Sequence, residues 1–163
     1  MTGWSMRQYC CNIVGKENGT EQPYYCGCVL SIMNKQDIID YWVSSAANDY
    51  RTMKNLVLSE DYSWCLFVGH IVIEKLLKAL YVQEIDENVP KTHDLNRLVA
   101  KIGIAVSDEQ MNQLDRITTF NISARYPDYK LSFYKKCDKQ FATQSIEVIE
   151  GARKWILEKL QKQ

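Results

Sequence analysis

Residues 61–83 constrain the fold more than any other part of the chain. Eight apolar or small residues recur here at three- and four-residue steps and form one helical face: Cys65, Leu66, Gly69, Val72, Ile73, Leu76, Leu77 and Leu80. Phe67, Ile71 and Tyr81 make much of the opposite side apolar as well. Because a helix that is apolar on two sides is buried on two sides, we expect this helix to be central or to lie at a subunit interface.

Four more segments carry helical signals, namely residues 35–58, 93–102, 107–124 and 132–161. Asn34 can cap the helix that starts at residue 35, and Thr92 can cap the one that starts at residue 93. Ser107 and Gln110 form a capping box, and Gly103 ends the preceding helix. No segment reads convincingly as a strand, and no internal repeat is evident. The sequence therefore predicts an all-α fold, a five-helix up-and-down bundle.

The beginning of the chain differs from the rest, because residues 1–32 show no sustained period and hold four of the six cysteines. We predict an irregular N-terminal extension over residues 1–33 and a helical bundle over residues 34–163. The simplest interpretation makes Met33 the functional start; the alternative is a small lobe with a hairpin around Asn18 and Gly19. The four cysteines follow a C-C and C-x-C pattern, which is not the usual spacing of a structural zinc site. We therefore predict no metal site.

Charge and hydropathy exclude several classes of protein. The 163 residues carry 20 Lys and Arg against 20 Asp and Glu, which argues against a strongly basic nucleic-acid coat. The longest nearly unbroken apolar run, residues 65–73, is too short to cross a bilayer. Residues 4–14 lack the apolar stretch and cleavage site of a secretory signal. We expect no membrane partner and a cytoplasmic location, where thiols stay reduced.

Three motifs in a fixed order point to a family. They are E-K-L-L-K-A-L at residues 74–80, Pro90 followed by T-H-D-L at residues 92–95, and A-R-Y-P-D at residues 124–128. With this order and spacing the chain resembles the HEPN domain, in the prokaryotic branch often encoded beside a minimal nucleotidyltransferase. The resemblance covers about residues 37–160.

The resemblance implies a helical bundle that dimerises and takes part in nucleotide or RNA transactions. Many members are toxins of toxin–antitoxin pairs and metal-independent ribonucleases with an Arg-x(4–6)-His motif. Arg125 is the matching arginine, but residues 126–132 contain no histidine, and the chain has only His70 and His93. In some members the partner nucleotidylates a tyrosine near this motif; Tyr126, Tyr129 and Tyr134 are present, but the motif that would single one out is missing. We therefore expect weak or no ribonuclease activity and no cofactor.

Arg125 begins a segment suited to a phosphate and a base. From residue 125 to residue 139 the chain has five basic and two acidic side chains, with aromatic side chains among them. Basic residues among aromatic ones suit nucleotide or RNA binding by phosphate contact and stacking. The residues predicted to bind are Arg125, Tyr126, Asp128, Lys130, Lys135 and Lys136. The structural alternative is that Arg125 and Asp128 close the end of a helix and the aromatic side chains join the core.

The two histidines are weaker candidates for catalysis. His70 and Glu74 lie one helical turn apart and could pair a base with a carboxylate. The favoured interpretation is structural, with His70 satisfied in an apolar interface and Glu74 bridging to Lys78. For His93, we favour local packing in the first turn of a helix.

Three classes of function remain. The first is a nucleotide- or RNA-binding module in a toxin–antitoxin-type pair with a nucleotidyltransferase. The second is a ribonuclease in which His70 or His93 replaces the missing base. The third is a non-catalytic module that dimerises and docks a nucleotidyltransferase. We favour the first, as a homodimer.

Overall fold

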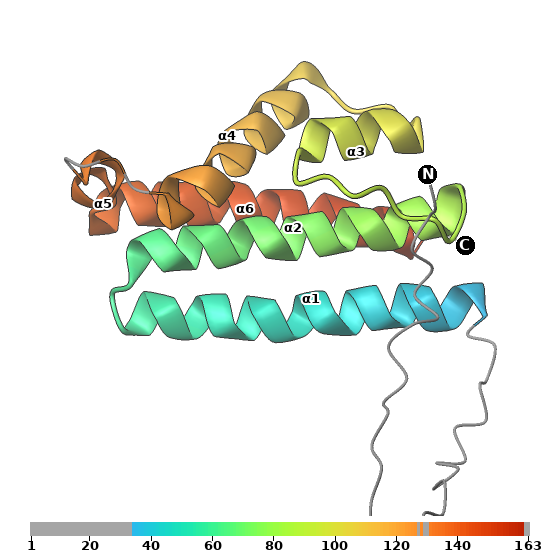
Figure 1. Ribbon diagram of the computed structural model, residues 1–163, viewed down its shortest axis with the longest axis horizontal. Helices are drawn as coiled ribbons and strands as arrows, with labels where there is room; N and C mark the ends of the chain where they lie inside the picture. Colours follow the sequence, from blue (N-terminus) through green and yellow to red (C-terminus); the bar gives the residue numbers. More distant parts are fainter. Residues whose placement is uncertain (1–33, 127, 129–130, 162–163) are drawn as a thin grey trace, which may run out of the picture. The chain divides into compact units, whose positions relative to one another are not determined.

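The computed structural model describes residues 34–126, 128 and 131–161. Within this part, the chain forms helices and no strand, so the all-α prediction is confirmed. The helices are α1 Lys35–Leu58, α2 Tyr62–Glu84, α3 Leu95–Ile102, α4 Asp108–Arg125, α5 Ser132–Lys136 and α6 Lys139–Leu160 (Figure 1). The predicted extension, its cysteines, Tyr129 and Lys130 lie outside the described residues.

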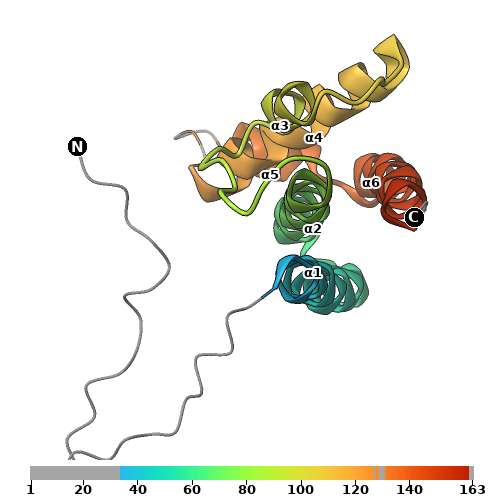
Figure 2. The same ribbon diagram turned by 90° about the vertical axis from the view of Figure 1, so that its right-hand side faces the viewer.

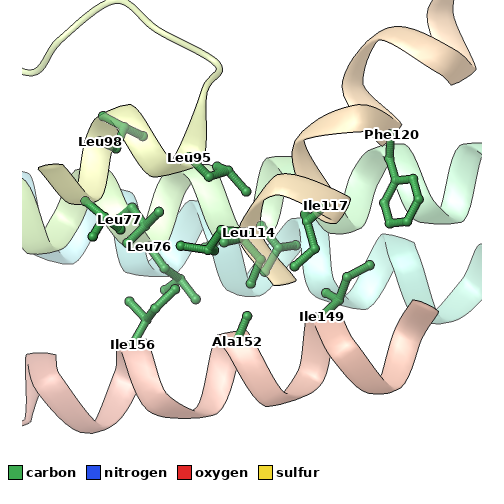
Figure 3. Packing of buried hydrophobic residues seen from close by; sticks show 14 of the residues in the cluster. Leu76, Leu77, Leu95, Leu98, Leu114, Ile117, Phe120, Ile149, Ala152 and Ile156 are labelled. Carbon is green, nitrogen blue, oxygen red and sulfur yellow. The ribbon is translucent and has the colours of Figure 1, made fainter. Parts of the chain in front are cut away.

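Helix α2 is the central element of the bundle, as predicted. Its neighbours are α1, α3, α4 and α6. Figure 2, which looks nearly along the helix axes, shows α1 on one side of α2 and α3 and α4 on the other, with α6 beside them. Leu76 and Leu77 of α2 meet side chains of three other helices in the core (Figure 3): Leu95, Leu98, Leu114, Ile117, Ile149 and Ile156. Burial on two sides is thus met within one chain.

The close approach of α1, α2 and α6 depends on Gly69. A Cβ atom on this residue would lie 2.6 Å from Cδ1 of Ile149 in α6 and 3.1 Å from Sδ of Met53 in α1. Both neighbours are fully buried. Glycine at this position therefore lets three helices pack closer than a larger residue would allow.

Two of the predicted caps are confirmed. Oδ1 of Asn34 accepts from the backbone N–H of Asp37 at 2.9 Å, and the Asp37 carboxylate accepts from the N–H of Asn34 in return. Ser107 and Gln110 bond in the same reciprocal way at the start of α4. Gly103 ends α3 with a φ of 75°, a backbone conformation that favours glycine.

Two predicted boundaries were wrong. Helix α3 begins at Leu95, because Asp94 rather than Thr92 caps it by accepting from the N–H of Arg97 at 2.9 Å. The last helix is divided in two, so the described residues form six helices rather than five. The division follows from Asp138, whose carboxylate accepts from the N–H of Phe141 at 2.8 Å and starts α6 afresh.

No helix in the described part of the chain combines the length and hydropathy needed to cross a membrane. Among the same residues, no three His, Cys, Asp or Glu side chains come together as a metal-binding group would.

Candidate functional site

A hollow of about 250 Å³ opens on the side of α2 that faces α1, α4 and the segment before α3. We call it the Arg125 pocket. Nine residues line it: Trp42, Phe67, Ile71, Glu74, Lys75, Lys78, His93, Asn121 and Arg125. The pocket thus brings together residues from all three motifs of the sequence analysis.

Arg125 lies at the end of α4 with its guanidinium held by neutral groups. Its Nε donates to the backbone oxygen of Asn121 at 2.8 Å. The guanidinium carbon lies 5.5 Å from the ring centre of Phe67 and 5.3 Å from that of Tyr126. No carboxylate of the described residues forms an ion pair with Arg125. The guanidinium keeps its charge and its terminal N–H groups for an anionic ligand.

Glu74 connects three basic side chains at the other end of the pocket. Its Oε1 accepts from Nζ of Lys78 at 2.6 Å, and its Oε2 accepts from Nδ1 of His93 at 2.9 Å. Burial opposes the charged form of this carboxyl, but the hydrogen bonds from Lys78 and His93 outweigh it and lower the pKa of Glu74. Glu74 is therefore an ionised carboxylate at neutral pH. The predicted bridge from Glu74 to Lys78 is confirmed.

His70 has a structural position beneath this cluster. Its side chain is fully buried, and Nε2 lies 2.9 Å from the backbone oxygen of His93. Because a carbonyl oxygen only accepts, Nε2 carries the proton and donates. Nδ1 lies 4.0 Å from Oε2 of Glu74 and has no hydrogen-bond partner within the described part. Burial lowers the pKa of His70, which keeps it neutral.

His93 is placed differently from what its sequence neighbours indicated. It precedes α3 instead of starting it, and 65% of its side chain is exposed. Since Nδ1 donates to the Glu74 carboxylate, neutral His93 presents Nε2 as an acceptor. A carboxylate, an oriented imidazole and a guanidinium thus line one pocket. No local pattern indicated the contact between Glu74 and His93, which lie 19 residues apart.

The predicted basic segment is distributed over different places. Asp128 accepts from the backbone N–H of Ser132 at 3.2 Å and from its hydroxyl group, at the start of α5. Nζ of Lys136 lies 4.9 Å from the ring centre of Phe141, which Arg116 approaches to 5.6 Å. Lys135 is exposed on α5, and Tyr126 is 70% exposed beside Arg125.

These contacts separate Lys136 from Arg125. Arg116 and Arg125 are nine residues apart on α4, which is two and a half turns and puts them on opposite faces of the helix. Lys136 shares an aromatic ring with Arg116, whereas Arg125 lies over Phe67. Of the predicted binding residues, only Arg125 lines the pocket.

A second hollow of about 250 Å³ lies at the start of α2, lined in part by Glu60, Asp61 and Tyr134. Its two carboxylates repel anions, so it suits a phosphate ligand less well than the Arg125 pocket does.

The sequence model of the HEPN domain matches residues 39–160. Among solved structures, the chain is similar to the crystal structure of TT1696 from Thermus thermophilus, with a TM-score of 0.65 and 19% sequence identity. The match covers 74% of this chain and 97% of that one, and at this identity it shows the fold alone. A comparison with curated proteins gave no match.

Proposed function

Because the chain belongs to the HEPN domain family, we propose that it is a nucleotide- or RNA-binding module whose Arg125 pocket takes a phosphate. The observation that carries this proposal is the guanidinium of Arg125, which lines the pocket without a carboxylate partner among the described residues. Guanidinium binds phosphate through paired, charge-assisted hydrogen bonds.

The charge balance of the pocket supports an anionic ligand. Lys78 is paired with Glu74, and Nζ of Lys75 lies 2.6 Å from Oδ2 of Asp49. These two lysines are thus neutralised, and the positive charge of Arg125 remains. Phe67 beneath the guanidinium and Trp42 across the pocket add surfaces on which a base can stack.

Nucleotide binding by purified full-length protein tests the proposal. We expect Arg125→Ala to weaken binding of a nucleoside monophosphate about 10- to 100-fold, because hydrogen bonds to a charged group contribute about 1.5–3 kcal/mol. Arg116→Ala is the matched control, since it removes the same charge from the opposite face of α4. Equal affinity of Arg125→Ala and wild type would contradict the proposal.

We further propose that the domain is a homodimer and half of a toxin–antitoxin-type pair with a minimal nucleotidyltransferase. HEPN domains often dimerise, and large apolar side chains lie exposed on the helices that carry the pocket, among them Trp64, Ile122 and Tyr126. Burying such side chains favours association. Sedimentation at micromolar concentration should show a dimer; a monomer would contradict this part. A non-catalytic docking role predicts the dimer without nucleotide binding.

One observation favours the ribonuclease as a second candidate. Glu74 orients His93 so that Nε2 is available as a base in the pocket that Arg125 also lines. Nε2 would take the proton of a ribose 2′-hydroxyl while the 2′-oxygen bonds to phosphorus and the P–O5′ bond breaks. The 5′-oxygen would take a proton from a water molecule, to which His93 returns one, leaving a 2′,3′-cyclic phosphate. Cleavage of RNA that is lost in His93→Ala, with binding retained, would favour this candidate over binding alone.

A further inference from the structure

Asn121 is a buried polar side chain that no group among the described residues satisfies. It lies on α4 and lines the Arg125 pocket, with 6% of its surface exposed. Its backbone oxygen accepts from Nε of Arg125, but its carboxamide forms no hydrogen bond within the described part of the chain. A buried polar group without a partner costs about 1–3 kcal/mol. A carboxamide in this position is explained by a ligand group that enters the pocket.

The position of Asn121 relative to Arg125 defines which part of a ligand it can reach. The two residues are four apart on one helix, so they lie on the same face about 6 Å apart along the axis. A phosphate on the guanidinium of Arg125 therefore directs the rest of a nucleotide along α4. Phe67, which lies against Arg125, and Ile71 one turn further along α2 give that path an apolar wall.

We propose that Asn121 recognises the base and makes the pocket selective for adenine nucleotides. This inference rests on the proposed phosphate site at Arg125. A carboxamide presents one donor and one acceptor side by side. Adenine offers the complementary pair on one edge, the N6 amino group and N7, whereas guanine offers two acceptors there, O6 and N7. Pyrimidines lack the N7 acceptor altogether.

A purely structural role for Asn121 predicts different behaviour. If the carboxamide stabilised the fold, its replacement by leucine, which has a similar size, would lower the melting temperature. Since the carboxamide has no partner among the described residues, we expect Asn121→Leu to keep or raise the melting temperature while it removes the preference for adenine. Stability and base preference thus respond in opposite ways to one substitution.

The test is a calorimetric titration of the full-length protein with AMP, GMP, CMP and UMP. We expect AMP to bind about 5- to 150-fold more tightly than GMP, the range that one bidentate contact gives. Asn121→Leu and Asn121→Asp should bring the four affinities together. Asn112→Ala, an exposed asparagine on the same helix, should keep the preference for AMP.

The outcomes separate this inference from the phosphate site. If the four nucleotides bind equally well and Arg125→Ala weakens all of them, the role of Asn121 is overturned and the phosphate site stands. A preference for GMP, or a preference for AMP that survives in Asn121→Leu, would also overturn the role of Asn121. If no nucleotide binds, both fail.

Discussion

Replacing Gly69 by alanine should destabilise the protein, although alanine is the better helix former. The added Cβ atom would lie 2.6 Å from Cδ1 of Ile149 and 3.1 Å from Sδ of Met53, both fully buried. Overpacking of a dense core costs about 1–3 kcal/mol. The gain from replacing a helical glycine by alanine is about 0.5–1 kcal/mol. We therefore expect Gly69→Ala to lower the free energy of unfolding by about 1–2 kcal/mol.

Gly151 provides the matched control, because it lies within α6 and a Cβ atom there meets nothing within 4 Å. Gly151→Ala should raise the free energy of unfolding by about 0.5–1 kcal/mol. Urea denaturation followed by circular dichroism measures both variants, and a common slope shows that the same unfolding transition is compared. If Gly69→Ala is as stable as Gly151→Ala, the helices α1, α2 and α6 do not pack tightly around Gly69.

Three further predictions concern the site and the helix boundaries. Because the pKa values of Glu74 and His70 are lowered by folding, stability should fall as the pH drops below about 6.5, the ordinary pKa of histidine, first through His70 and then through Glu74; Glu74→Gln should reduce the lower part of this dependence in thermal melts from pH 7 to pH 4. Asp138→Ala should cost about 1 kcal/mol by removing the cap of α6, whereas Asp115→Ala on the exposed side of α4 should cost less. A chain that begins at Met33 should melt within a few degrees of the full-length protein, because every core residue in the described part of the chain lies after it; a large fall would show that the first part belongs to the fold.

The apolar pattern of the sequence was sufficient to predict the fold class and the central helix. The period of residues 61–83 predicted burial on two sides, and α2 is covered by α1, α4 and α6. Caps were predictable where the side chain and its partner lie three residues apart, as for Ser107 and Gln110. The break before α6 was missed because the apolar period continues through Cys137 and Phe141, while the local cap at Asp138 overrides it.

The pocket was only partly predictable. Arg125 was identified from its motif, but the contact of Glu74 with His93 joins two segments 19 residues apart and has no local signal. Asn121 was missed for a different reason. An asparagine in a helix interior reads as an exposed polar residue, and only tertiary packing shows that it is buried. The predicted link between Arg125 and Lys136 assumed a continuous surface, whereas the two side chains contact different aromatic rings.

Nuclear magnetic resonance of the full-length protein during titration with AMP tests most directly whether the Arg125 pocket binds a nucleotide phosphate. We predict that the side-chain Nε–H resonance of Arg125, the carboxamide of Asn121 and the imidazole of His93 shift together and saturate at the same ligand concentration. Resonances of Arg116 should stay unchanged. Shifts confined to Arg116 and Lys136, with Arg125 unaffected, would place the ligand on the opposite face of α4 and contradict the proposal.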